Sequence, residues 1–476
     1  MLRNKLPKGI LWLVLGGISI ILLVPEAQAV PSFGRQTGMS CTVCHTVFPE
    51  LTPFGRNFKL TGYTMSKHSK KPYEWPPPVA GMFQASFTHN NKSLPPNVIQ
   101  GLDPQGSSKG NDNVNFPQAI SLFYGGRIVP HVGGFIQGTF DGVAEKFFLD
   151  NTDVRVTATP ELFGKDLVLG ITANNNPTVQ DVLNTTPAFR FPAASGVIAL
   201  TPAAGAVIDG ALGQQVGGFG GYFYWNNLIY GEATFYRTAR SGFTQFLGAG
   251  TVTDTIVDGV APYWRVFLQH QWGQHSLAVG HYGMVARIFP EKNAVDANGN
   301  PIPNLFNTRG VADRFADTGF DAQYQYLGRK HIFTAQTTYI HEDQRWDATF
   351  AQGGSDNNHN WLDTYRINLN YYYRTAKWGT LGGTVGYFST WGSRDSGLYA
   401  PDPGDGSRTG KPNSDGFILE FDYVPWWQNT KVTIQYTLYN RFNGARRSYD
   451  GDVTDFPNRR DASNNNTLYI LVWQML

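Results

Sequence analysis

Cysteine is nearly absent from this chain, which has 2 cysteines among 476 residues. Two are too few for a small scaffold stapled by disulfides. Charged residues are also sparse, at 16%, and after the N-terminus no apolar run reaches the roughly eighteen residues of a membrane-spanning helix. These absences exclude a disulfide-rich domain and a polytopic helical membrane protein. They do not exclude a β-barrel membrane protein, because its strands alternate apolar and polar residues and therefore contain no long apolar run.

The first 29 residues have the pattern of a secretory signal peptide. Arg3, Lys5 and Lys8 precede an apolar stretch at residues 10–24, which is followed by a proline and a small-x-small triplet at residues 27–29. The alternative, an uncleaved membrane anchor, requires a longer apolar span. The full chain has a formal net charge of +2. Cleavage before Val30 leaves 35 basic and 35 acidic residues, so the mature chain has no formal net charge. We therefore expect no nucleic-acid partner.

Both cysteines fall in one pentapeptide, Cys41-Thr42-Val43-Cys44-His45. Cys-x-x-Cys-His is the attachment pattern of haem c, in which two thiols bond the porphyrin and the histidine binds the iron. A zinc site needs further ligands and the chain has no second cysteine pair. A thioredoxin-like redox pair needs a βαβ context, which is absent. The motif predicts one covalent haem c attached through Cys41 and Cys44, with His45 as the proximal ligand.

A six-coordinate haem iron needs a second axial ligand, usually Met or His. Met65 and His68 follow the motif at a distance that allows a helical turn and a return, so they are candidates, with plain packing or surface roles as the alternative. Candidates to pair with the haem propionates are Arg35, Arg56 and Lys59, although exposed basic side chains are the commoner explanation. The other methionines after Met1 are Met39, Met82, Met284 and Met475.

Residues 30–78 read as a short segment that depends on its surroundings. Pro53 is suited to the first turn of a helix, and Gly62 marks the end of this stretch. Some fifty residues are too few for a self-sufficient core. Three consecutive prolines at residues 76–78 then form a stiff break before the rest of the chain.

From residue 79 onward, apolar and polar residues alternate in short segments separated by clusters of Gly, Asn, Asp and Pro. Val432, Ile434, Tyr436 and Leu438 form one such alternating set. The pattern predicts sixteen strands, at residues 79–89, 117–129, 131–140, 148–158, 165–174, 215–225, 228–238, 260–272, 274–286, 317–327, 331–341, 361–373, 380–391, 415–424, 431–441 and 466–476.

The connections between these segments alternate between long and short, with one exception between residues 140 and 148. Outer-membrane barrels place short turns on the periplasmic side and long loops outside, whereas a soluble sandwich has no reason to do so. An even number of strands puts both ends of the chain on the periplasmic side. The sequence therefore predicts an all-β fold, an outer-membrane antiparallel β-barrel of about 16 strands with extracellular long loops.

The N-terminal segment resembles the fused monohaem cytochrome–porins of the bacterial outer membrane, a family of iron-oxidising outer-membrane cytochromes. The resemblance covers residues 31–45, 48–51, 54–55 and 58–63. The barrel agrees with this family only in length and pattern. The resemblance implies one covalent haem c on Cys41 and Cys44, with His45 on the iron. It also implies electron transfer from an extracellular donor, Fe(II) in characterised members, to a periplasmic c-type cytochrome or copper protein.

These expectations divide the chain into a signal peptide at 1–29, a cytochrome segment at 30–78 and a barrel at 79–476 that contacts outer-membrane lipid. Because the apolar band of such a barrel is about 25 Å tall, one haem serves both sides only if residues 30–78 plug the lumen. Electron transfer needs no catalytic acid or base. The alternatives are a solute porin gated or modulated by a redox-sensing haem segment, and a periplasmic haem enzyme.

Overall fold

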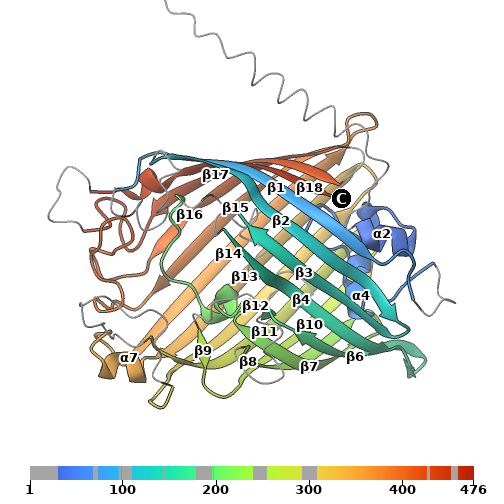
Figure 1. Ribbon diagram of the computed structural model, residues 1–476, viewed down its shortest axis with the longest axis horizontal. Coiled ribbons are helices and arrows are strands. Elements are labelled where there is room, and N and C mark those ends of the chain that lie inside the picture. The colour runs from blue at the N-terminus through green and yellow to red at the C-terminus, as the bar shows by residue number, and fades with distance from the viewer. Residues whose placement is uncertain are drawn as a thin grey trace, which may run out of the picture.

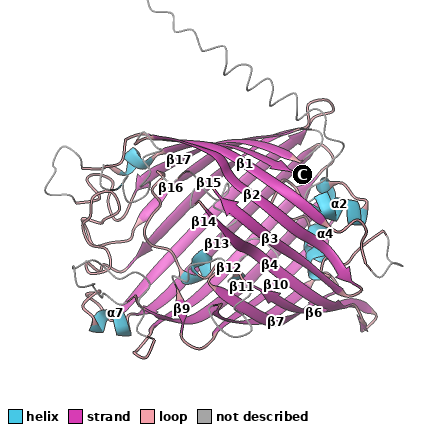
Figure 2. Ribbon diagram, viewed as in Figure 1, coloured by secondary structure: helices cyan, strands magenta, loops and turns pink. Residues whose placement is uncertain are grey.

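The computed structural model is a closed antiparallel β-barrel (Figures 1 and 2). Each strand pairs with its neighbours in the chain, and the last strand pairs with the first, so the sheet has no free edge. The sixteen strands of this ring are β1 (Val79–Asn90), β2 (Asp112–Val129), β3 (Val132–Asp141), β4 (Lys146–Ala158), β6 (Lys165–Asn174), β7 (Val216–Trp225), β8 (Ile229–Thr238), β10 (Ala261–Trp272), β11 (His275–Phe289), β12 (Asp313–Leu327), β13 (His331–Arg345), β14 (His359–Arg374), β15 (Thr380–Gly392), β16 (Ser414–Val424), β17 (Thr430–Arg441) and β18 (Thr467–Met475).

The structure describes residues 31–67, 73–95, 98, 110–142, 145–177, 196, 198–239, 255–291, 308–425, 429–451 and 459–476. The predicted signal peptide lies outside these residues. Two short strands, β5 (Glu161–Leu162) and β9 (Ile256–Val257), extend the sheet locally. The short helices α7 (Asp347–Ala351) and η5 (Ala462–Asn465) lie in connections at the long-loop end.

All sixteen predicted strands are present, and the main errors are at their ends. The sequence placed the start of β2 at Pro117, whereas the strand begins at Asp112. The proline stands beside a bulge, where the pairing register of β1 and β2 shifts between Gln84 and Ser86. Since proline cannot donate to the ladder and occurs in strands mainly at edges and bulges, it marked an irregularity within the strand and not the strand's start.

Side chains alternate between the two faces of the barrel wall. On β16, Phe417, Leu419 and Phe421 are exposed on the outer face, while Glu420 and Asp422 are buried inside. The same alternation gives the wall an apolar exterior, whereas the lumen carries polar and charged side chains. Buried ion pairs link neighbouring strands there, including Lys431 with Asp422 at 3.2 Å.

Both ends of the barrel sequence lie at the end that carries the short turns. The backbones of Gly81 on β1 and Leu476 after β18 exchange hydrogen bonds of 2.9 and 2.8 Å. The connections between β2 and β3, β7 and β8, and β10 and β11 are also at this end, and the long connections are at the other (Figure 1).

The N-terminal segment fits into the short-turn end of the barrel. It contains α2 (Pro31–Thr37), the single turn α3 (Cys41–Cys44) and α4 (Pro53–Leu60). Helix α4 begins as predicted, with Pro53 in its first turn, and the Thr52 hydroxyl accepts a hydrogen bond from the Gly55 N–H. Among the described residues, no helix is long and apolar enough to cross a membrane.

Contacts from α4 and the residues after it reach several strands of the wall. The Arg56 guanidinium is buried and donates to Gln269 on β10 and Gln323 on β12, both at 2.7 Å. The Tyr63 hydroxyl donates to Asp153 on β4 at 2.7 Å, and the Tyr222 hydroxyl on β7 donates to the Leu60 carbonyl at 2.7 Å. Because these strands surround the segment, it occupies the lumen at this end, as predicted.

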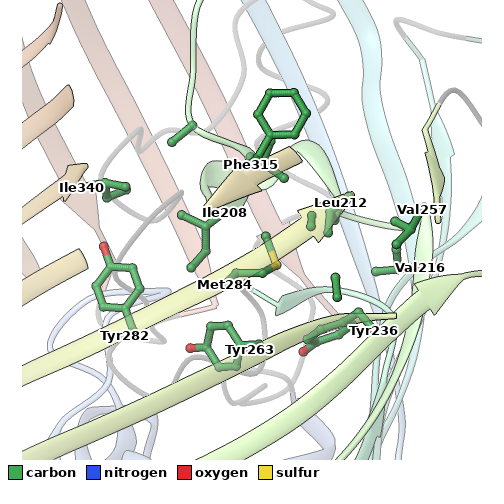
Figure 3. Packing of buried hydrophobic residues seen from close by; sticks show 14 residues of the cluster. Ile208, Leu212, Val216, Tyr236, Val257, Tyr263, Tyr282, Met284, Phe315 and Ile340 are labelled. Carbon is green, nitrogen blue, oxygen red and sulfur yellow. The ribbon is translucent and has the colours of Figure 1, made fainter. Parts of the chain in front are cut away.

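A second segment crosses the lumen farther from the short turns. Residues 198–215 include the turn η2 (Val207–Ala211), whose Asp209 carboxylate pairs with Arg366 on β14. At the other end of the segment, the Gln214 amide donates to Asp150 on β4 at 2.9 Å. Figure 3 shows Ile208 and Leu212 of this segment packed near Met284 and other side chains of the wall. We call residues 207–214 the crossing segment.

Candidate cofactor site

The two cysteines and the following histidine form one turn and a short extension. In α3, the His45 N–H donates to the Cys41 carbonyl at 2.9 Å, which closes the turn. Residues three apart in a helical turn lie on the same side, so Cys41 and Cys44 are neighbours. They are not joined in a disulfide. Burial, together with the nearby Cys41, raises the pKa of the Cys44 thiol to about 11.

The motif is fastened to the start of α4. The Thr52 N–H donates to the Cys44 carbonyl at 2.9 Å, and the Thr52 hydroxyl donates to the Val43 carbonyl at 2.6 Å. Gly55 lies so close that a methyl group in its place would stand 2.2 Å from the Cys44 carbonyl oxygen. Packing therefore requires glycine at position 55, because any side chain there would prevent α4 from approaching the motif this closely.

The His45 imidazole is held in one orientation. Its Nδ1 lies 3.2 Å from the Glu50 carbonyl oxygen. A carbonyl can only accept, so Nδ1 carries the proton and Nε2 keeps its lone pair. Burial lowers the pKa of His45 to about 4, despite hydrogen bonds to backbone that oppose the shift. The imidazole is therefore neutral at neutral pH, which is the form that binds metal ions.

A cavity of about 700 Å³ opens beside Cys41, Cys44 and His45. It lies between the N-terminal segment, the wall and the crossing segment, whose Gly210 and Gln214 line it. Aromatic side chains of the lining come from both the segment and the wall, and they are Phe33, Phe48, Phe58, Phe123, Phe135 and Trp473. The lining also includes polar side chains, among them Gln137, Asp150, Asn151 and Asn176.

The cavity has room for a large, mostly apolar group. Its volume falls within the roughly 300–1,000 Å³ of typical ligand pockets, and its lining includes many aromatic side chains. Two reduced cysteine thiols on one side of a turn can form two thioether bonds, and a neutral imidazole can bind iron. The residues present therefore suit the group that the Cys-x-x-Cys-His pattern predicts.

Other residues singled out from the sequence are placed differently. Met65 lies outside the cavity lining, and its carbonyl accepts from the Gln36 amide at 2.8 Å. His68 falls outside the described residues. Of the basic side chains, Lys59 lines the cavity, Arg56 donates to glutamines of the wall, and Arg35 donates to the Val79 carbonyl. A propionate role stays a prediction that the geometry favours most for Lys59.

Sequence reasoning did not single out the wall residues of the site. Met82 on β1 and Met475 on β18 line the cavity together with the cysteines, although they lie far from the motif in sequence. Only closure of the barrel brings them there, so no local signal could select them from the other methionines. Among the described residues, no group of three or more His, Cys, Asp or Glu side chains is arranged to hold a metal ion.

No protein-family model and no curated protein matches the chain. Solved structures with a similar course of the chain include a loop-deletion mutant of OmpT from Vibrio cholerae, with 10% identity, coverage of 84% of this chain and 98% of that one, and a TM-score of 0.43. An anion-selective porin from Comamonas acidovorans has 9% identity and a TM-score of 0.42, and the match covers 84% of this chain and 98% of the porin. OmpF from Salmonella typhi gives 8% identity, 84% and 97% coverage, and a TM-score of 0.40. The barrel architecture follows from the strand pairings alone.

Proposed function

We propose that this protein is an outer-membrane electron-transfer protein with one covalent haem c in its lumen. The observation that carries the proposal is that Cys41, Cys44 and His45 line a large aromatic cavity inside the barrel. Cys41 and Cys44 hold the haem, and the Nε2 of His45 binds its iron. When bound, the haem accepts and donates single electrons.

The membrane placement follows from the distribution of side chains on the wall. Apolar residues such as Phe417, Leu419 and Phe421 face outward on a barrel without free edges, which suits contact with lipid. The short turns and both ends of the barrel sequence then face the periplasm, and the long loops face outward. A cleaved signal peptide at residues 1–29 exports the chain to this location.

The site lies between two compartments. The cavity is lined by the N-terminal segment and by the crossing segment, and the N-terminal segment lies at the short-turn end of the barrel (Figure 1). An extracellular donor, Fe(II) by the resemblance described above, reaches the site from the loop side. A periplasmic c-type cytochrome or copper protein takes the electron on from the N-terminal segment.

Two measurements test the proposal. Purified protein denatured on a gel stains for covalent haem, and its mass exceeds that of the mature chain by one haem. In stopped-flow mixing, anaerobic Fe(II) converts the ferric Soret band to the ferrous one. Absence of covalent haem contradicts the whole proposal. A ferric band that ferrous iron leaves unchanged over minutes rejects Fe(II) as the donor while leaving electron transfer from another donor in place.

A second candidate is a solute porin whose haem segment senses redox state and gates the pore. The observation that favours it is the wall itself, because a barrel of sixteen strands is wide enough for an aqueous channel when its lumen is open. In this candidate the N-terminal segment moves when the haem changes its oxidation state. Single-channel conductance that differs between oxidised and reduced protein supports gating, and a closed channel in both states rejects it.

A further inference from the structure

Two methionines face each other where the barrel closes. Met82 on β1 and Met475 on β18 are directly paired in the register of these two strands. Both side chains are buried and belong to one cluster with Ala80 and Phe123. Both also line the cavity that contains Cys41, Cys44 and His45. Two thioethers of the wall therefore border the same space as the imidazole, which comes from the N-terminal segment.

The other methionines of the described residues are less suited to the cavity. Met39 also lines the cavity, but it lies only two residues before Cys41 and is 38% exposed, whereas Met82 and Met475 are buried. Met65 is outside the lining, and Met284 is buried in the cluster around the crossing segment (Figure 3). The Tyr63 hydroxyl, another group with an oxygen that iron can bind, donates to Asp153.

Chemistry favours a thioether at this position. Methionine is a common second axial ligand of c-type haems and raises their reduction potential. A soft sulfur ligand also suits an apolar wall, because burying it needs no hydrogen-bond partner. A ligand from the wall has a mechanical consequence as well, since it ties the haem-bearing segment to the strand pair that closes the barrel.

We propose that the distal ligand of the haem iron is a thioether of the Met82–Met475 pair. The inference rests on the proposed function, because it presumes a haem attached at Cys41 and Cys44. With this ligand, the haem has its complete ligand set only when β1 and β18 have paired. The N-terminal segment supplies His45 and the barrel supplies the sulfur.

The test uses the full-length protein purified with its haem and three variants, M82L, M475L and the double variant. Leucine keeps a similar volume and removes the sulfur, so the barrel is expected to fold. M284L is the matched control, because Met284 is equally buried but lies away from the cavity. The readouts are the weak red absorption band of methionine-ligated ferric haem, the reduction potential, and binding of carbon monoxide to the ferrous protein.

We expect the double variant and one of the two single variants to lose the red band, to lower the reduction potential and to bind carbon monoxide within the mixing time. Wild type and M284L keep the band and bind carbon monoxide slowly or not at all. If the band persists in the double variant, the inference is wrong although the haem is present. If wild-type protein carries no covalent haem, the proposed function itself fails.

Discussion

Gly133 on β3 lies against the carbonyl group of Gly62, at the point where the N-terminal segment touches the barrel wall. A methyl group at Gly133 would stand 2.1 Å from the Gly62 oxygen, which is closer than any stable contact. Gly62 itself follows α4 with a φ of +70°, a conformation that glycine adopts readily. The two glycines therefore allow the end of the segment to dock on the wall.

Alanine at Gly133 is expected to loosen this docking. The added methyl group forces the backbone of residue 62 away from β3 at a cost of about 1–3 kcal/mol, which is typical of overpacking. Trypsin then cuts at Arg56 and Lys59, which are buried when the segment is docked, roughly five-fold or more faster than in wild type. G134A is the control, since the atoms nearest to its methyl group are 3.5 Å away. Equal cleavage of the two variants contradicts the contact.

Replacing Arg56 by methionine is expected to weaken the same docking from inside. The guanidinium donates to Gln269 and Gln323, and its removal leaves two buried amide oxygens without this donor, at a cost of about 2–3 kcal/mol. K67M removes an exposed cation of the same segment and serves as the control. The rate of trypsin cleavage between residues 31 and 67 measures the effect, and similar rates in both variants reject an anchoring role for Arg56.

The fold was largely predictable because its signal is repeated. Each strand alternates between lipid and lumen faces, so an error at one end, such as the start of β2 at Pro117, leaves the strand count intact. The turn that brings Cys41, Cys44 and His45 together was predictable because these residues are close in sequence, and haem attachment there stays a prediction. The wall of the site was not, since Met82 and Met475 come together only through the pairing of the first and last strands.

The crossing segment was also beyond sequence reasoning. Its position depends on Asp209 pairing with Arg366, and these residues lie 157 positions apart. Asp209 has no local pattern that distinguishes it from a solvated loop charge, and nothing local to Arg366 on β14 identifies its partner. Burial of the pair, with side-chain exposures of 0% and 7%, becomes visible only in the assembled lumen.

Breaking this pair is expected to release the crossing segment. R366M leaves the Asp209 carboxylate buried without its partner, which costs about 3–5 kcal/mol in buried ion pairs. We expect small reductants added to the protein to reach the haem several-fold faster in this variant, as measured by stopped-flow reduction. R441M, which breaks the more exposed pair with Asp415, is the control. An unchanged rate in R366M shows that the segment does not restrict access.

Removal of residues 31–67 is expected to open the barrel. In planar bilayers the full-length holo-protein gives little or no conductance, because the N-terminal segment fills one end of the lumen. The shortened protein, refolded to the same heat-modifiable barrel, gives a steady channel whose width is limited by the crossing segment that remains in the lumen. A wide channel in the full-length holo-protein contradicts the plug, and it favours the solute-porin candidate.

Electron transfer across a membrane is the central claim, and reconstituted vesicles test it most directly. Ferric cytochrome c is enclosed in vesicles that contain the protein, and anaerobic Fe(II) is added outside. The account predicts reduction of the enclosed cytochrome with wild-type protein, without leakage of an enclosed dye, and no reduction with the variant that has alanine at Cys41 and Cys44. Reduction at the same rate with that variant, or none with haem-loaded wild type, contradicts the account.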